Sequence, residues 1–145
     1  MSLLHLPLAV VSVTTRDYLH RARVTMARVS QHLPHARRLV YCVDAPIAAR
    51  DSNEPFDLIP AAALAIPRFR QLAFALPPVG LCCALKPHAL LHALNCYGAS
   101  RVLYLDNDVA LYRHPAEFLL ALESSTLLLT AHLLGPLPPQ VRPNE

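Results

Sequence analysis

The stretch RVLYLDNDVALY, residues 101–112, holds the strongest strand signal of the chain and ends it with two aspartates. Four apolar residues, 102–105, form a run typical of a strand that is buried on both faces. Asp106 and Asp108 follow two residues apart, and in a continuing strand such residues point to the same side. We therefore expect their carboxylates to project together from the carboxyl end of a central strand.

Strand and helix signals alternate along the rest of the chain. Short apolar runs predict further strands at 8–14, 37–45, 56–61 and 125–134. Because these strands are apolar throughout instead of alternating, the sequence predicts an α/β fold. Its Rossmann-like, mostly parallel sheet would be flanked by helices on both faces. Ligands of such sheets bind at the carboxyl ends of the strands.

The first helix is expected to follow the strand at 8–14, with Thr15 or Asp17 as its N-cap, and to end at Pro34. Its apolar positions recur at spacings of three and four and are Tyr18, Ala22, Met26, Val29 and Leu33. One or two helical turns are expected between the prolines of 65–78.

A longer helix over about 80–97 leads into the strand at 101, and Gly98 stands where a C′ residue is expected. Pro87 removes one backbone donor, which predicts either a kink or a later start of this helix. Its apolar stripe comprises Leu85, Leu91, Leu94 and Tyr97. Pro115 is expected at the N1 position of a last helix, 115–123.

Composition excludes several classes of protein. At 145 residues, 54% hydrophobic and only 16% charged, the chain can form one substantial core and is not of a disordered or fibrous type. No apolar run approaches the roughly 20 residues of a membrane-spanning helix, and no secretory signal is recognised, so a cytoplasmic protein is expected. The four cysteines form no CxxC pair and are expected to be free thiols in a reducing compartment.

The positive charge is concentrated in residues 1–50, which hold seven arginines against two acidic residues. A solvated helix face is the simplest interpretation of these arginines. Attraction to a phosphate-bearing ligand, or peripheral contact with an anionic membrane surface, is the alternative. Nucleic acid is not an expected partner, because no zinc-finger, RNP-like or aromatic-interleaved basic motif is present.

Asp106 and Asp108 are candidate metal ligands. Two carboxylates held close together repel each other unless a cation shares them. Mg²⁺ or Mn²⁺ takes oxygen ligands and is often completed by waters and substrate phosphates. The alternative is that both aspartates merely hydrogen-bond the backbone amides of the following turn.

Two other features of the helix at 80–97 bear on function. Lys86 is the only lysine among thirteen basic residues, and its compact ammonium suits a position near phosphates, although chance alone can leave one lysine there. His88 and His92 have the spacing of zinc-binding histidines, but Ala89 stands where the H-E-x-x-H motif has its glutamate. A solvated or partly buried histidine pair is expected instead.

The segments CALKPHALLHAL (83–94) and RVLYLDNDVALYRHPAEF (101–118) together resemble the central block of nucleotide-sugar glycosyltransferases with the GT-A fold. The resemblance is nearest to the family 8 type, which includes glycogenin-like and bacterial galactosyltransferase-like enzymes. Residues 10–34 are similar to the opening strand and helix of these enzymes, and residues 125–139 resemble the strand after their DxD motif.

The resemblance implies roles for particular residues. Asp106 and Asp108 match the DxD motif that binds Mn²⁺, with Asp106 also near the ribose, and Lys86 matches a lysine of the nucleotide-binding region. The first-strand turn, which meets the base and ribose in such enzymes, corresponds to Thr14, Thr15 and Tyr18. The implied donor is a UDP-sugar whose diphosphate the metal neutralises. The acceptor, a glycan, lipid or protein, is unknown.

These enzymes carry a further metal ligand, usually a histidine, and their catalytic residues in a later half of the domain. His132 lies in an apolar run and is expected to be a core or edge histidine. We therefore expect residues 1–134 to form an incomplete donor-binding domain and 135–145 a proline-rich loop or truncated tail. The full-length chain would then be a hexosyltransferase, and the fragment alone would be inactive.

Two other classes of protein stay open. One is a module that binds nucleotide without turnover. The other is a haloacid dehalogenase-like phosphatase, in which Asp106 would be the nucleophile and Asp108 the general acid/base. Such phosphatases need a later lysine, and no lysine follows Asp108 in this sequence.

Overall fold

The structure is a computed structural model that describes residues 7–44, 53–131 and 135. The chain divides into two compact units, with the boundary between Pro115 and Ala116. The first unit contains the sheet and the residues predicted to form the site. Each unit is described by itself.

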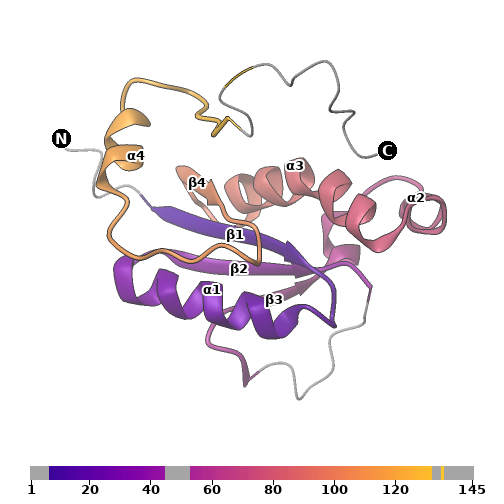
Figure 1. The fold of residues 1–145 in the computed structure, drawn as a ribbon. Coiled ribbons are helices and arrows are strands. Elements are labelled where there is room, and N and C mark those ends of the chain that lie inside the picture. The colour runs from indigo at the N-terminus through magenta and orange to yellow at the C-terminus, as the bar shows by residue number, and fades with distance from the viewer. Residues whose placement is uncertain (1–6, 45–52, 132–134, 136–145) are drawn as a thin grey trace. The chain divides into compact units, whose positions relative to one another are not determined.

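Four strands form a parallel sheet in the first unit (Figure 1): β1 (Leu8–Thr14), β2 (Arg37–Cys42), β3 (Asp57–Pro60) and β4 (Arg101–Tyr104). The strand order is β3-β2-β1-β4, and all three pairings are parallel. Helices flank the sheet, so the predicted α/β, Rossmann-like class is confirmed. The order runs in one direction from β1 to β3 and reverses for β4. The carboxyl ends of β1 and β4 therefore form a topological switch point, where ligands of open α/β sheets bind.

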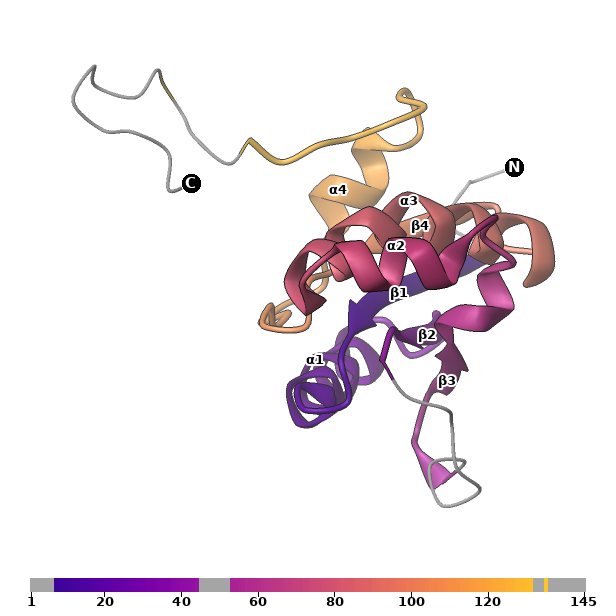
Figure 2. The ribbon, with the colours of Figure 1, turned by 90° about the vertical axis from the view of Figure 1, so that its right-hand side faces the viewer.

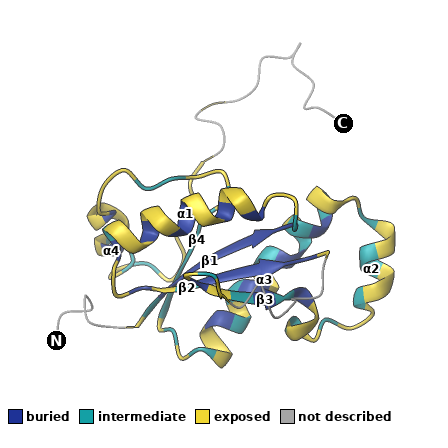
Figure 3. Cartoon of the chain, turned by 90° about the horizontal axis from the view of Figure 1, so that it is seen from below, coloured by how far each residue is buried: buried dark blue, intermediate teal, exposed yellow. Residues whose placement is uncertain are grey.

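Helices cover both faces of this sheet. α1 (Leu19–His32) lies along one face, and α3 (Pro78–Cys96) lies along the other, as Figures 1 and 2 show from two directions. The short helices η3 (Ala61–Leu64) and α2 (Phe69–Ala75) lie on the α3 side. Figure 3 shows buried residues along β1 and β2 and an exposed outer side of α1. β1 and β2 are buried because apolar side chains point to both faces and each face is covered.

The face of α3 that contacts the sheet differs from the predicted stripe. Leu85 is fully buried, but Leu91 and Leu94 are 56% and 39% exposed. The buried positions recur every four residues and are Leu81, Leu85, Ala89 and Ala93. The stripe prediction is confirmed for Leu85 and for the partly buried Tyr97, and it is wrong for Leu91 and Leu94. It favoured large side chains, whereas the two alanines allow a close approach of the helix to the sheet. α3 also begins at Pro78 and continues through Pro87, so of the two effects predicted for Pro87 the late start is wrong.

The start of α1 also corrects the sequence analysis. Neither Thr15 nor Asp17 caps the helix; Tyr18 occupies the N-cap position, and no side chain caps it. The backbone N–H of Tyr18 donates to the Thr15 carbonyl at 3.2 Å, so a turn precedes the helix. This turn leaves the Tyr18 ring 44% exposed, whereas the other predicted apolar positions, Ala22, Met26, Val29 and Leu33, are buried.

β4 lies at the edge of the described sheet, beside β1, so its predicted central place is wrong. β1 and β2 each have a neighbour on both sides, which agrees with the complete burial of β1 from Ala9 to Thr14. β4 ends at Tyr104, and the residues after it form a turn instead of continuing the strand. β2 likewise ends at Cys42, and residue 45 of the predicted strand lies outside the described residues.

In the second unit, the described residues form one short helix, α4 (Ala116–Ala121), and Pro115 directly precedes it instead of occupying N1. Residues 125–131 adopt no regular secondary structure, and Leu127 and Leu129 are 69% and 84% exposed. The strand predicted at 125–134 is therefore wrong over these residues, since no strand of the described ranges pairs with them. Its remainder, with His132, lies outside the described residues. Among the described helices, none has both the length and the apolar character to cross a bilayer.

Candidate functional site

The two aspartates lie at the switch point between β1 and β4. The backbone N–H of Leu105 donates to the Val11 carbonyl at 3.0 Å, which extends the contact of the chain with β1 by one residue beyond β4. The chain then turns, and the Val109 N–H donates to the Asp106 carbonyl at 3.0 Å. Residues 106–109 are called the DND turn below. Asp106 and Asp108 therefore share a turn and do not project from one face of a strand. The predicted location after β4 holds, but the reason given for their proximity was wrong.

Asp106 is held by two side chains through one of its oxygens. Oδ1 of Asp106 accepts a hydrogen bond from Lys86 Nζ at 2.7 Å and another from the Tyr104 hydroxyl at 2.9 Å. Lys86 Nζ also lies 4.9 Å from the centroid of the Tyr104 ring. Burial, and next the negative charge of Asp106, raises the pKa of Tyr104, so this phenol stays protonated and remains a donor. Lys86 and Asp106, predicted separately as site residues, therefore belong to one cluster.

Asp108 differs from Asp106 in its surroundings. Its side chain is exposed, and within the described part of the chain its carboxylate has no hydrogen-bond or ion-pair partner. Oδ2 of Asp106 likewise accepts no hydrogen bond from a described residue. The DND turn therefore offers carboxylate oxygens to solvent from both aspartates.

Asn107, between the two aspartates, is a site residue that the sequence analysis missed. Its Nδ2 donates to Thr14 Oγ1 at 2.8 Å, and its backbone carbonyl accepts a hydrogen bond from Thr25 Oγ1 at 3.1 Å. Both threonines are buried, Thr14 in β1 and Thr25 in α1. A DxD pattern ignores its middle residue, so the signal for Asn107 was only that asparagine favours turns through side-chain hydrogen bonds.

The three residues predicted to meet the base and ribose differ in accessibility. Thr14 is fully buried, and its hydroxyl donates to the Thr15 carbonyl at 3.1 Å while it accepts from Asn107. Thr15 is 8% exposed, whereas the Tyr18 ring is 44% exposed and carries the Arg21 guanidinium 4.8 Å from its centroid. Of the three, only Tyr18 is exposed to solvent to a large extent. Its ring is therefore the accessible aromatic surface of this turn.

A groove of about 550 Å³ opens at the carboxyl ends of β2 and β3. Its lining comes from the ends of these strands and from η3, α2 and the start of α3, and it is mostly apolar. Asp44, after β2, lies at this groove and accepts a hydrogen bond from the Arg16 backbone N–H at 2.8 Å. An apolar strand that ends in an aspartate was the available signal for Asp44, as it was for Asp106.

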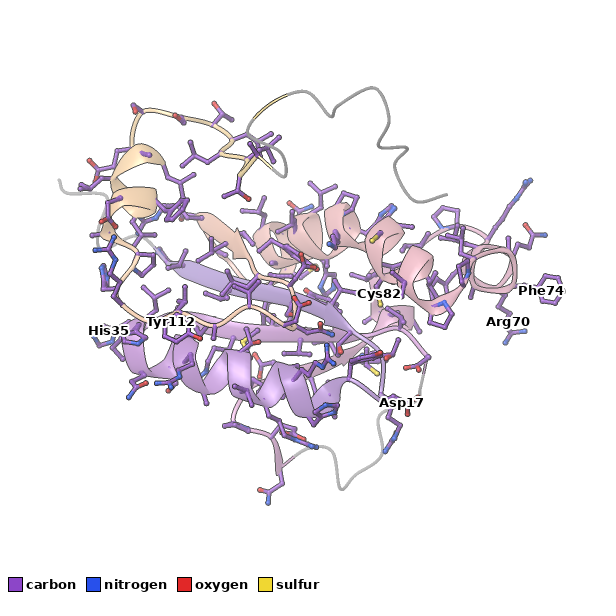
Figure 4. The ribbon with its side chains drawn as sticks, in the orientation of Figure 1. Asp17, His35, Arg70, Phe74, Cys82 and Tyr112 are labelled. Atoms are coloured by element: carbon purple, nitrogen blue, oxygen red, sulfur yellow. The ribbon has the colours of Figure 1, made fainter. Side chains whose placement is uncertain are left out.

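α3 contributes residues both to the groove and to the cluster at the DND turn. Leu81 lines the groove, and Lys86 reaches Asp106. Cys82, one turn before Lys86 and labelled in Figure 4, lies between them in the helix. Burial, and next the charge of Cys83, raises the pKa of the Cys82 thiol to about 11. Cys82 is therefore a neutral thiol at physiological pH and not a reactive thiolate.

The residues of the DND turn suit a hard divalent cation. Within residues 7–44, 53–131 and 135, no three histidine, cysteine, aspartate or glutamate side chains gather as a complete metal site. The two aspartates alone match the way in which Mg²⁺ is often bound, through one or two carboxylates with waters and substrate phosphates. The chemistry of the available carboxylate oxygens thus fits Mg²⁺ or Mn²⁺.

Comparison of the chain with protein-family models, with curated proteins and with solved structures gives no match.

Proposed function

We propose that this chain is the donor-binding part of a cytoplasmic nucleotide-sugar glycosyltransferase that binds a UDP-sugar together with Mn²⁺ or Mg²⁺. Asp106 and Asp108 would hold the cation, and the cation would neutralise the diphosphate and stabilise the leaving nucleotide. Transfer would go to a glycan, lipid or protein acceptor. The observation that carries this proposal is the contact of Lys86 with Asp106 at the switch point of a parallel sheet.

Lys86 supports the proposal because of what its position implies for an incoming diphosphate. Its ammonium lies 2.7 Å from Asp106 Oδ1, and its side chain is 30% exposed. When a cation engages the aspartates, their negative charge is shared and Lys86 becomes available to a phosphate oxygen. The same cluster thus contains carboxylates for the cation and an ammonium for the anion, which is the pairing that a metal-bound diphosphate requires.

Two features at the same edge of the sheet suit the nucleoside part of such a ligand. The exposed Tyr18 ring offers an aromatic surface for stacking, a contact that every nucleobase can make. Asp44 offers a carboxylate that can accept hydrogen bonds from ribose hydroxyls, as acidic residues do in doubly wound folds. Both follow strands that end at the same edge of the sheet.

The test is a thermal-shift titration of the whole chain with UDP, with and without Mn²⁺. A ligand that binds only the folded state raises stability by about 2.7 kcal/mol at one hundred times its Kd. We expect a shift with UDP that depends on Mn²⁺ and that disappears in Asp108→Ala. Glu123→Ala, which removes an exposed carboxylate from the second unit, is the matched control and should leave the shift unchanged.

A folded wild-type chain that shows no Mn²⁺-dependent shift would contradict the proposal. A shift that persists in Asp108→Ala would place the cation elsewhere and contradict the role of the DND turn. Incubation with UDP-hexoses then separates an enzyme, which releases UDP, from a module that binds nucleotide without turnover.

A further inference from the structure

The DND turn presents its three polar residues in two different directions. Asp106 and Asp108 are exposed, whereas Asn107 is only partly exposed and makes its contacts with the protein interior. The inward direction of Asn107 is determined by two hydrogen bonds, one from its side chain and one to its backbone carbonyl. This middle residue therefore connects the turn to the fold.

The two partners of Asn107 belong to different elements. Thr14 ends β1, and Thr25 lies in α1 on the face of the helix that covers the sheet. Thr14 and Thr25 are 0% and 2% exposed, so neither hydroxyl exchanges its partner readily with water. The turn is thus attached both to β1, an interior strand of the sheet, and to the helix α1 that covers it.

The direction of each hydrogen bond is also determined. The Thr14 hydroxyl donates its hydrogen to the Thr15 carbonyl at 3.1 Å, so its remaining capacity is that of an acceptor. Within the Asn107 amide, only the Nδ2 group can donate a hydrogen bond to Thr14 Oγ1, and it does so at 2.8 Å. With a residue at position 107 that lacks a side-chain donor, the buried Thr14 hydroxyl would keep its bond to the Thr15 carbonyl but would accept no hydrogen bond from residue 107.

We propose that Asn107 is a positioning residue for the divalent cation: by tying the DND turn to Thr14 and Thr25, it holds the carboxylates of Asp106 and Asp108 ready for one ion. This inference rests on the proposed cation site. Two aspartates on a free loop would separate, because like charges repel and because ordering the backbone costs entropy. The hydrogen bonds of Asn107 supply that ordering before the ion arrives.

The attachment should affect cations differently according to their size. Mg²⁺ demands near-octahedral geometry and Mn²⁺ is typically octahedral with oxygen ligands, whereas Ca²⁺ is larger and accepts six to eight oxygens in flexible arrangements. A turn held in one conformation therefore favours the smaller ions. Loosening the turn should weaken the binding of Mn²⁺ more than that of Ca²⁺.

The test uses the full chain and measures the Kd of Mn²⁺ and of Ca²⁺ by isothermal titration calorimetry. Removing one hydrogen bond of this kind is expected to change affinity by about 3- to 10-fold. We therefore expect Asn107→Ala to weaken Mn²⁺ by about tenfold and Ca²⁺ by less than about threefold. Thr25→Val and Thr25→Ser form a matched pair, since valine keeps the shape and removes the hydroxyl, whereas serine keeps the hydroxyl.

Rescue distinguishes positioning from a general loss of stability. Thr25→Val should weaken Mn²⁺ about threefold, and Thr25→Ser should bind Mn²⁺ like the wild type, although it lacks the buried methyl group. If Asn107→Ala does not fold, the comparison of Mn²⁺ affinity between Thr25→Val and Thr25→Ser is sufficient to test the inference. Equal Mn²⁺ affinities in the wild type and in Asn107→Ala or Thr25→Val would overturn the inference, as would equal losses in Thr25→Val and Thr25→Ser.

Failure of the proposed function gives a different result. If the wild-type chain does not bind Mn²⁺, or if Asp108→Ala binds it equally well, the cation site itself is refuted and the inference falls with it. If Asp108→Ala abolishes binding while Asn107→Ala retains it, the cation site stands and only the positioning role is overturned.

Discussion

Replacing Lys86 by methionine should separate ligand binding from stability. Lys86 Nζ lies 2.7 Å from Asp106 Oδ1, and the two side chains are 30% and 52% exposed. An ion pair exposed to this degree contributes only about 0–1 kcal/mol to folding. Methionine keeps the unbranched shape of the side chain. We therefore expect the free energy of unfolding of Lys86→Met to fall by less than about 1 kcal/mol.

The effect on nucleotide binding should be larger. At about 4 Å, two unit charges interact by about 1 kcal/mol in water and about 4 kcal/mol at an effective dielectric constant of 20. Lys86 is partly exposed, so its contact with a diphosphate should lie between these limits. We expect a loss of about 1–3 kcal/mol, which corresponds to about 5- to 150-fold weaker binding of UDP in the presence of Mn²⁺.

The assay is isothermal titration calorimetry of UDP in saturating Mn²⁺, at low and at high salt. Binding to Lys86→Met should depend less on salt than binding to the wild type, because the charge of Lys86 no longer contributes. Arg70→Met is the matched control for net charge; Arg70 is exposed on α2, where Figure 4 shows it pointing away from the rest of the molecule. Unchanged UDP affinity in a folded Lys86→Met variant would refute the reasoning. Equal losses of UDP affinity in Lys86→Met and Arg70→Met would show that the effect comes from the net charge of the protein and not from the position of Lys86.

Three further predictions concern the fold that supports the site. Leu85→Ala should destabilise the protein by about 2–5 kcal/mol in urea titrations, because Leu85 is fully buried in the core between α3 and the sheet; a loss below about 1 kcal/mol would contradict this packing. Ser12→Ala should be neutral or stabilising by up to about 1 kcal/mol, since the buried Ser12 hydroxyl has no partner among the described residues, and clear destabilisation would reveal a partner. Burial raises the pKa of Tyr41, which is fully buried, so above about pH 10 the unfolded chain loses a proton that the folded chain retains. Stability should therefore fall with rising pH, by up to about 1.4 kcal/mol per pH unit, and Tyr41→Phe should fall less steeply; equal slopes for the two proteins would contradict this assignment.

The candidate site was only partly predictable from the sequence. Asp106, Asp108 and Lys86 stood out by residue type and by their place in the pattern, and the structure brings Lys86 and Asp106 into contact. Asn107 and Asp44 were missed because their local signals are weak: asparagine is common in turns, and a single aspartate after a strand is not specific for a ligand site. Their roles depend on partners such as Thr25, which lies 82 residues before Asn107.

The sequence by itself determined the class of the fold and most of its elements. Apolar runs with β-branched residues and helical periodicity are local properties, and they sufficed to predict β1, α1 and the parallel sheet. Tertiary structure decided what local patterns cannot encode: the edge position of β4, the buried alanines of α3 and the absence of a strand at 125–131. Strand order, helix contacts and the turn at Asn107 all require hydrogen bonds and packing between residues far apart in the chain. These long-range contacts, and not the DxD pattern alone, place Asp106 and Asp108 at the switch point of the sheet.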